Sequence, residues 1–351
     1  MPPALWCKSH YSFLEGASSP GELVARAVEL GLPALALTDR DGVPGVPSAW
    51  LAARGTALKL IIGSQVSIDD GTSITLLAAD RRGYANLCGL VTAGAMRAPK
   101  GQGTVRWDEV AAHAEGLLAL WGGRGSALIA DDAPRTAMAT LREAFGDRLH
   151  ALAARHRHAP EQRAERRLRE RAAQLGIEVV AAVEVLYHDR ARRPLQDVLT
   201  CIREGTTVDE AGTRLQPNDR HALPSAAQMR HLFADDPAAL AAASEAADRC
   251  AFDLADLRYR YPAEFLPFGM SEARWLDALV TKGARERFGQ PVPADMAERI
   301  ARELALIHEL DYEGYFLTMA EIVRFCGEQG ILCQGRGSAA NSVVCYCLKV
   351  T

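Results

Sequence analysis

A short glycine-rich stretch near the end of the chain, residues 333–342 ("CQGRGSAANS"), could hold a phosphate. Gly335 and Gly337 allow the backbone to turn sharply and to expose its amide groups. Ser338 supplies a hydroxyl and is predicted to cap a following helix, whose positive end would face the turn. Arg336 adds a fork of donors that fits phosphate oxygens. The pattern alone is compatible with a phosphate-binding turn and with a purely structural strand-to-helix turn, and both interpretations stay open.

The elements around this turn are predicted to be mostly helical. Residues 331–333 read as a short apolar strand leading into the turn. Apolar residues recur at helical spacing in three segments before it, which are 271–289, 293–311 and 315–330. The turn lacks the Gly-x-x-x-x-Gly-Lys spacing of a P-loop, so a P-loop nucleotide site is excluded.

The first 260 or so residues alternate strand-like and helical patterns, which predicts an α/β domain, either barrel-like or doubly wound. The strand candidates are 34–39, 59–68, 73–79, 116–121 and 177–186. The helical candidates include 20–31 and the charged stretch 147–176. The latter could form a nucleic-acid stripe, but a solvated outer helix is the favoured interpretation. The Pro- and Gly-containing segment 258–269 marks a domain junction, so we predict domains 1–262 and 263–351.

Composition narrows the class of protein. Hydrophobic residues make up 48% and charged residues 24% of the 351 residues, which is typical of globular domains. The net charge of −4 gives no overall signal for nucleic-acid binding. The eight cysteines form no Cys-x-x-Cys pair, which argues against a thiolate zinc site or a disulfide framework. No apolar run is long enough for a membrane span and no secretory signal is visible, so a cytoplasmic location is predicted.

Several segments resemble one protein family. Residues 314–351 are similar to the start of the palm in bacterial C-family DNA polymerases, the polymerase III alpha subunits. Segments 9–39, 81–91 and 192–210 are similar to the PHP domain that precedes that palm. The stretches "SFLEGASSPGEL", "RRPLQD" and "CQGRGSAANSVVCYCL" point to the error-prone branch. The resemblance implies a PHP-type distorted β/α barrel followed by the mostly helical start of a nucleotidyltransferase-type palm.

The resemblance also implies a function for the full-length protein in translesion synthesis and damage-induced mutagenesis. Arg336 would face the incoming triphosphate, and Gly337 and Ser338 would be the family's Gly-Ser pair. The family's paired aspartates would lie further downstream and bind two Mg²⁺ ions. The last acidic residue here is Glu328, so no catalytic residue is expected in this chain. The implied partners are primer–template DNA, dNTP, the sliding clamp and the accessory proteins of the mutagenesis cassette, with no membrane.

The metal-ligand positions of an active PHP domain hold mostly unsuitable residues here. The matching positions are Trp6, Lys8, Asp39, Arg40, Gln65, Glu184 and Leu186, with Ser73 as a looser match. Positive charge at two of them opposes cation binding. His10 and His188 lie nearby but off the expected register. We therefore predict a PHP domain without a metal centre that serves as a structural platform, in which Asp39 forms a salt bridge with Lys8 or Arg40.

Two alternatives stay open at this point. One is a non-catalytic PHP-like module that binds partner proteins or DNA. The other is a stand-alone PHP metal phosphoesterase, which the lost ligands disfavour. The last ~80 residues are also expected to be less stable than the front domain. That expectation assumes exposed apolar side chains at Val343, Val344, Tyr346 and Leu348.

Overall fold

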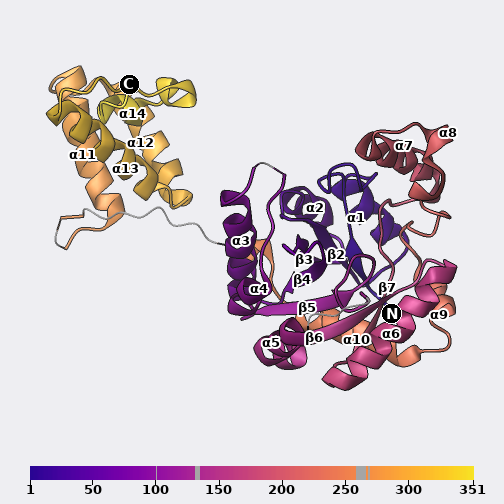
Figure 1. Cartoon of the computed structure of the whole chain (residues 1–351). Helices are drawn as coiled ribbons and strands as arrows, with labels where there is room; N and C mark the ends of the chain where they lie inside the picture. The colour runs from indigo at the N-terminus through magenta and orange to yellow at the C-terminus, as the bar shows by residue number, and fades with distance from the viewer. Residues whose placement is uncertain (100, 131–134, 258–265, 268) are drawn as a thin grey trace. The chain divides into compact units, whose positions relative to one another are not determined.

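A computed structural model describes residues 1–99, 101–130, 135–257, 266–267 and 269–351. The chain forms two compact units, Met1–Leu257 (unit 1) and Arg258–Thr351 (unit 2), both drawn in Figure 1. The domain boundary predicted between residues 262 and 263 lies outside the described residues, so it stays a prediction.

Unit 1 is built around one seven-stranded sheet whose strands lie in sequence order. Strand β4 runs antiparallel to both neighbours, and all other neighbouring strands are parallel. A parallel bridge from Cys7 to Val185 joins β1 to the segment after β7, so the sheet nearly closes into a barrel. This confirms the predicted α/β class and the distorted barrel. The strands are β1 (Ala4–Cys7), β2 (Ala34–Arg40), β3 (Lys59–Ser67), β4 (Ser73–Ala78), β5 (Leu117–Gly122), β6 (Leu149–Ala154) and β7 (Val179–Ala182).

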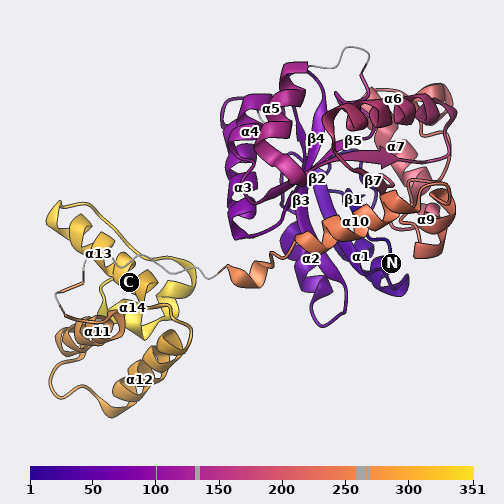
Figure 2. The same cartoon turned by 90° about the horizontal axis from the view of Figure 1, so that it is seen from below.

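Alternate residues of the strands supply two separate apolar layers, because successive side chains point to opposite faces of a sheet. On β2, Leu35 and Leu37 belong to the large cluster under the outer helices. Ala34 and Ala36 belong to an inner cluster, which small residues of α10 (Pro237–Arg249) complete. Figure 2 shows the strands in the middle of unit 1 with helices around them.

Local signals place the helices of unit 1. Helix α1 begins after Ser19, whose hydroxyl accepts the Glu22 N–H while the Glu22 carboxylate accepts the Ser19 N–H. It ends before Gly31, which adopts φ +62°, so the helix predicted at 20–31 is confirmed. The helices besides α10 are α1 (Pro20–Glu29), α2 (Val46–Ala53), α3 (Arg81–Met96), α4 (Trp107–Ala112), α5 (Arg135–Phe145), α6 (Ala159–Leu175), α7 (Arg193–Glu204), α8 (Val208–Ala211) and α9 (Ala226–Leu232).

Two predictions for unit 1 are wrong. The stretch 147–176 is not one helix, because Leu149–Ala154 forms strand β6 and only α6 carries the charged helix. A buried parallel strand is apolar throughout, so its pattern does not separate it from a neighbouring helix. The strand predicted at 177–186 is only Val179–Ala182, and strand β1 was not predicted.

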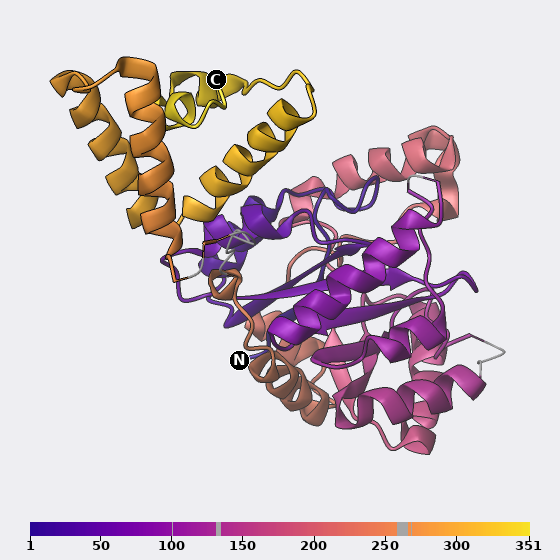
Figure 3. The same cartoon turned by 90° about the vertical axis from the view of Figure 1, so that its left-hand side faces the viewer.

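Unit 2 contains the three predicted helices within a few residues of the predicted ends. They are α11 (Glu272–Phe288), α12 (Ala294–Glu309) and α13 (Glu313–Glu328). The short helix α14 (Val343–Cys347) packs against α11 and α12, and α11 also packs against α13 (Figure 3). The mostly helical character expected for this part of the chain is confirmed.

The tail of unit 2 differs from its prediction. Residues 331–333 do not form a strand, and Gly337–Asn341 form a 3₁₀ turn before α14. Ser342 caps α14 by accepting the Cys345 N–H, in the role predicted for Ser338.

The apolar residues expected on the surface of this tail are mostly buried. Val343, Val344 and Leu348 are at most 8% exposed because α14 folds back onto α11 and α12, and only Tyr346 stays exposed. The lower stability expected for unit 2 remains a prediction that hydrogen exchange can test. Within the described residues, no helix is long and apolar enough to cross a bilayer.

Candidate functional site

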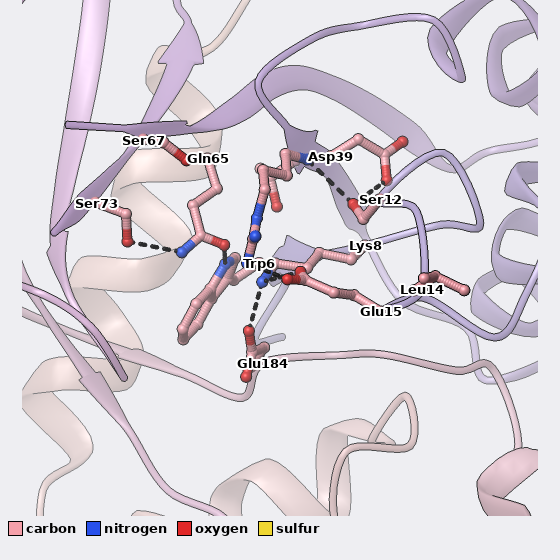
Figure 4. A network of polar contacts seen from close by, with 12 residues as sticks. Trp6, Lys8, Ser12, Leu14, Glu15, Asp39, Gln65, Ser67, Ser73 and Glu184 are labelled. Atoms are coloured by element: carbon pink, nitrogen blue, oxygen red, sulfur yellow. Dashed lines mark hydrogen bonds and ion pairs between the residues drawn. The ribbon is translucent and has the colours of Figure 1, made fainter. Parts of the chain in front are cut away.

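The carboxyl ends of β1 and β2, the loop after β1 and the segment after β7 bring four charged side chains together. Figure 4 labels three of them, Lys8, Glu15 and Glu184. Lys8 Nζ lies 2.7 Å from Glu184 Oε1 and 3.0 Å from Glu15 Oε2. Arg40 pairs with the other Glu15 oxygen from the solvent side. The Lys8 side chain is only 4% exposed, so this is a buried ion cluster. We call Lys8, Glu15, Arg40 and Glu184 the strand-end cluster.

Opposite charges hold this cluster in its ionised form. Burial alone would raise the pKa of Glu184, but the positive charges of Lys8 and His221 outweigh burial and lower that pKa to about 2. Burial alone would lower the pKa of Lys8, but Glu184 and Glu15 raise it above its ordinary value. Both groups are therefore charged at neutral pH.

Asp39 does not form the predicted salt bridge with Lys8 or Arg40. Its carboxylate accepts the Ser9 N–H at 2.7 Å, the Ser9 hydroxyl at 2.8 Å and the Ser12 hydroxyl at 2.7 Å. Burial raises the pKa of Asp39, and these donors counteract the rise. The prediction fails because neutral donors of the loop after β1 contact the Asp39 carboxylate, while Lys8 points to Glu15 and Glu184.

Three further positions predicted from the resemblance, Trp6, Gln65 and Ser73, form hydrogen bonds between uncharged side chains. Gln65 Nε2 donates to Ser73 Oγ at 2.8 Å, and Trp6 Nε1 donates to Gln65 Oε1 at 3.4 Å (Figure 4). The Trp6 indole is 1% exposed and lies against Gly123. A Cβ at Gly123 would stand 2.3 Å from the indole, so this packing requires glycine there.

The remaining predicted positions lie apart from the cluster. Leu186 is buried in a small apolar group with Ala17 and Tyr187. His188 Nδ1 lies 2.7 Å from Ser18 Oγ, and the exposed His10 packs beside Tyr11. Among the described residues, neither histidine makes a hydrogen bond or an ion pair with the strand-end cluster, and their role as ordinary histidines stays a prediction.

Two buried histidines beside Glu184 were not predicted. The rings of His156 and His221 stack with centroids 3.9 Å apart. The Glu184 N–H donates to His156 Nε2 at 2.9 Å, and the Glu161 carboxylate lies 2.7 Å from His156 Nδ1. Burial, followed by the charge of His156, lowers the pKa of His221 to about 4. The sequence carries no signal for this pair, because the two residues come from separate loops.

A PHP-type metal centre does not fit these residues. The Glu184 and Glu15 oxygens already bind an ammonium group, the Asp39 oxygens accept three hydrogen bonds, and Gln65 is neutral. A divalent ion at this position would face the Lys8 charge at close range. In the described ranges, no group of three or more His, Cys, Asp or Glu side chains is arranged to hold a metal ion.

The glycine-rich turn of unit 2 is open to solvent. Arg336, Gly337 and Ser338 are all exposed, and Gly337 adopts φ +63°, where glycine is favoured. The Gly335 N–H donates to the Val350 carbonyl at 2.6 Å, which anchors the start of the turn. The three predicted residues are therefore accessible to a ligand.

The N-terminal end of α14, which follows the turn, is not free to bind a phosphate. The Glu303 carboxylate accepts the Val343 N–H at 3.0 Å and also accepts the Ser342 hydroxyl. An acidic side chain of α12 thus occupies the positive end of α14. The prediction that this helix end would serve the phosphate is wrong, and only the turn itself remains available.

Comparison with known families defines the class of protein. Residues 5–156 match the PHP domain, and residues 274–351 match the bacterial DNA polymerase III alpha NTPase domain. The chain therefore combines a PHP domain with residues that match the polymerase III alpha NTPase domain. The predicted resemblance to the polymerase III alpha subunits is confirmed.

The similar curated proteins carry the name error-prone DNA polymerase. The chain is 42% identical over 348 residues to the protein of Pseudomonas paraeruginosa, and 43% identical over 350 residues to that of Alkalilimnicola ehrlichii. Each alignment covers 99% of this chain and 33% of the relative, so the chain spans about a third of their length. A solved amidohydrolase from Chromobacterium violaceum aligns over 53% of this chain and 88% of its own, with 16% identity and a TM-score of 0.41.

Proposed function

We propose that this chain is the N-terminal portion of an error-prone DNA polymerase that acts in translesion synthesis and damage-induced mutagenesis. The observation that carries the proposal is the alignment of 99% of the chain with proteins of that name. The proposed substrates of the whole protein are primer–template DNA and dNTP. The proposed partners are a sliding clamp and the accessory proteins of a mutagenesis cassette, and the proposed location is the cytoplasm.

In this proposal unit 2 contributes to the nucleotide site. The exposed guanidinium of Arg336 would bind triphosphate oxygens, and the backbone at Gly337 and the Ser338 hydroxyl would add donors. Two Mg²⁺ ions, when bound, stabilise the attacking and leaving oxygens of nucleotidyl transfer. Residues 339–351 contain no carboxylate that could hold them. We therefore expect residues 1–351 alone not to extend a primer.

Unit 1 serves in this proposal as a structural platform without a metal centre. The strand-end cluster supports this role, because its internal ion pairs tie β1 and β2 to the segment after β7. Phosphoester hydrolysis of the PHP type would need a bound metal, which these residues do not fit. The platform would instead hold the polymerase part in place.

A primer-extension assay tests the proposal once the coding DNA beyond Thr351 has been read. We expect a continuing frame with paired aspartates, and Mg²⁺-dependent extension by its product. Arg336→Ala should raise the KM for dNTP, and Arg302→Ala, an exposed arginine of the same unit, should not. A reading frame without such aspartates would favour the alternative of a non-catalytic PHP-like binding module. Mn²⁺- or Zn²⁺-dependent phosphatase activity of residues 1–351 would overturn the metal-free platform.

A further inference from the structure

Unit 1 contains a cavity that the proposed function does not use. The cavity measures about 620 Å³ and is lined by α1, the loops after β6 and β7, residues 219–225 and α9. None of the four residues of the strand-end cluster is among its described lining residues. Its volume is in the range of small-molecule sites. We call this cavity the basic pocket.

The walls of the basic pocket carry a local excess of positive charge. They include five arginines and two aspartates, although the chain as a whole has a net charge of −4. The arginines are Arg26, Arg155, Arg157, Arg190 and Arg220, and the aspartates are Asp189 and Asp219. Such an excess in a concave site with low-dielectric walls attracts anions.

Two of these arginines are already committed to carboxylates of the protein. Arg155 makes paired hydrogen bonds to both Glu165 and Asp235. Arg26 hydrogen-bonds Glu29 at 2.8 Å. These two guanidiniums shape the wall more than they offer donors to a ligand.

The other three arginines keep donors available. Arg190 and Arg220 approach the same Asp219 carboxylate at 3.7 and 3.6 Å, which is too long for a hydrogen bond. In the part of the chain that the structure describes, Arg157 has no carboxylate within 4.0 Å. Its backbone adopts φ +58°, which is uncommon for a non-glycine residue. These three guanidiniums line one pocket and can therefore offer donors to a polyanionic group.

Another part of the wall is apolar. Leu30, Val183, Leu223 and Leu232 line the pocket, and Leu223 and Val183 are buried. An apolar or aromatic body would lose little hydration against these side chains, while its charged group would contact the arginines. Planar guanidiniums match phosphate oxygens with two parallel hydrogen bonds.

We propose that the basic pocket binds a small organic phosphate, of which a nucleoside monophosphate is the representative. The site is separate from the proposed dNTP contact, because Arg157, Arg190 and Arg220 belong to unit 1 and Arg336 belongs to unit 2. It therefore goes beyond the proposed polymerase function and does not depend on it.

Isothermal titration calorimetry of residues 1–351 tests this inference with three probes at fixed ionic strength. Adenosine monophosphate should bind saturably, inorganic phosphate more weakly, and adenosine weakest. The double variant Arg157→Asn/Arg220→Gln should weaken binding of adenosine monophosphate about tenfold or more, since each charge-assisted hydrogen bond contributes substantially. Asparagine is chosen at position 157 because it tolerates positive φ. Arg190→Gln provides a second, single-site variant with the same expected direction.

Two controls make the result specific. Arg82→Gln removes an arginine of the same unit that is 66% exposed and pairs with Glu115, and it should leave the affinity unchanged. Arg336→Ala should also leave it unchanged, and a loss there would assign the binding to the turn of unit 2 and overturn the inference. Absence of saturable binding, equal affinity for adenosine, or unchanged affinity in the double variant and in Arg190→Gln would each overturn it as well.

Discussion

The strand-end cluster of unit 1 and the glycine-rich turn of unit 2 use polar groups in opposite ways. In the cluster, buried carboxylates bind an ammonium group of the same chain. In the turn, Arg336, Gly337 and Ser338 leave their donors exposed to solvent. A site whose charges are neutralised internally supports the fold, and a site whose donors remain exposed can bind a ligand. The two regions therefore differ in their expected response to mutation.

The largest effect is expected from removing the cation of the cluster. Lys8→Met leaves Glu15 and Glu184 buried without their main counter-charge, which should lower the free energy of unfolding by about 3–5 kcal/mol. Urea denaturation monitored by tryptophan fluorescence measures this loss of stability. Arg82→Ala breaks an exposed ion pair of the same unit and should cost less than about 1 kcal/mol. Equal losses in the two variants would show that water already solvates the cluster.

Acid should destabilise the surroundings of the cluster. The folded-state pKa of His221, about 4, lies below its ordinary value of 6.5, so the unfolded state binds the proton first as the pH falls. Stability should therefore decrease between pH 6.5 and 4, by about 3 kcal/mol from this group. The folded-state pKa of Glu184 is also depressed, to about 2, so its contribution is lost between pH 4.5 and 2.

Urea denaturation at a series of pH values tests this sign. The His221→Gln variant should show a flatter dependence between pH 6.5 and 4 than the unmodified protein. Glu184→Gln should instead flatten the dependence of stability on pH between pH 4.5 and 2. Parallel curves for His221→Gln and the unmodified protein would contradict the assignment to His221.

A smaller effect is expected at the start of α14 in unit 2. Glu303→Ala removes the acceptor of the Val343 N–H and should destabilise α14 by about 1–2 kcal/mol. Hydrogen exchange of the α14 amides measures the loss. Glu298→Ala on the same helix removes a carboxylate that is 74% exposed and should change exchange very little. Unchanged protection in Glu303→Ala would mean that Ser342 alone caps the helix.

The smallest effect on stability is expected at the turn itself. Arg336 is exposed, so Arg336→Ala should change the free energy of unfolding by no more than about 0.5 kcal/mol. The same change should weaken dNTP binding by the whole polymerase about tenfold. Thermal denaturation and primer-extension kinetics together separate the two effects. A large loss of stability with unchanged nucleotide affinity would reverse the contrast between the two regions.

Much of the fold could be predicted because its signals are local. Pro20 and Gly31 mark the two ends of α1, and the apolar run in residues 59–68 marks β3, so the sequence alone predicted both elements within a few residues. Strand β6 was missed because its apolar residues run directly toward a charged helix, and periodicity does not distinguish a buried strand from a buried helix.

The sequence by itself determined that Lys8 and Arg40 carry positive charge at positions where the resemblance predicts metal ligands. Only the tertiary structure decided their partners. Lys8 and Glu184 are 176 residues apart and meet because the sheet nearly closes from β7 back to β1. The pairing of β1 with β2 places Asp39 beside the serine donors of the loop after β1, and folding stacks His156 of the loop after β6 on His221. Charge is a property of single residues, whereas pairing depends on distances that only the folded chain sets.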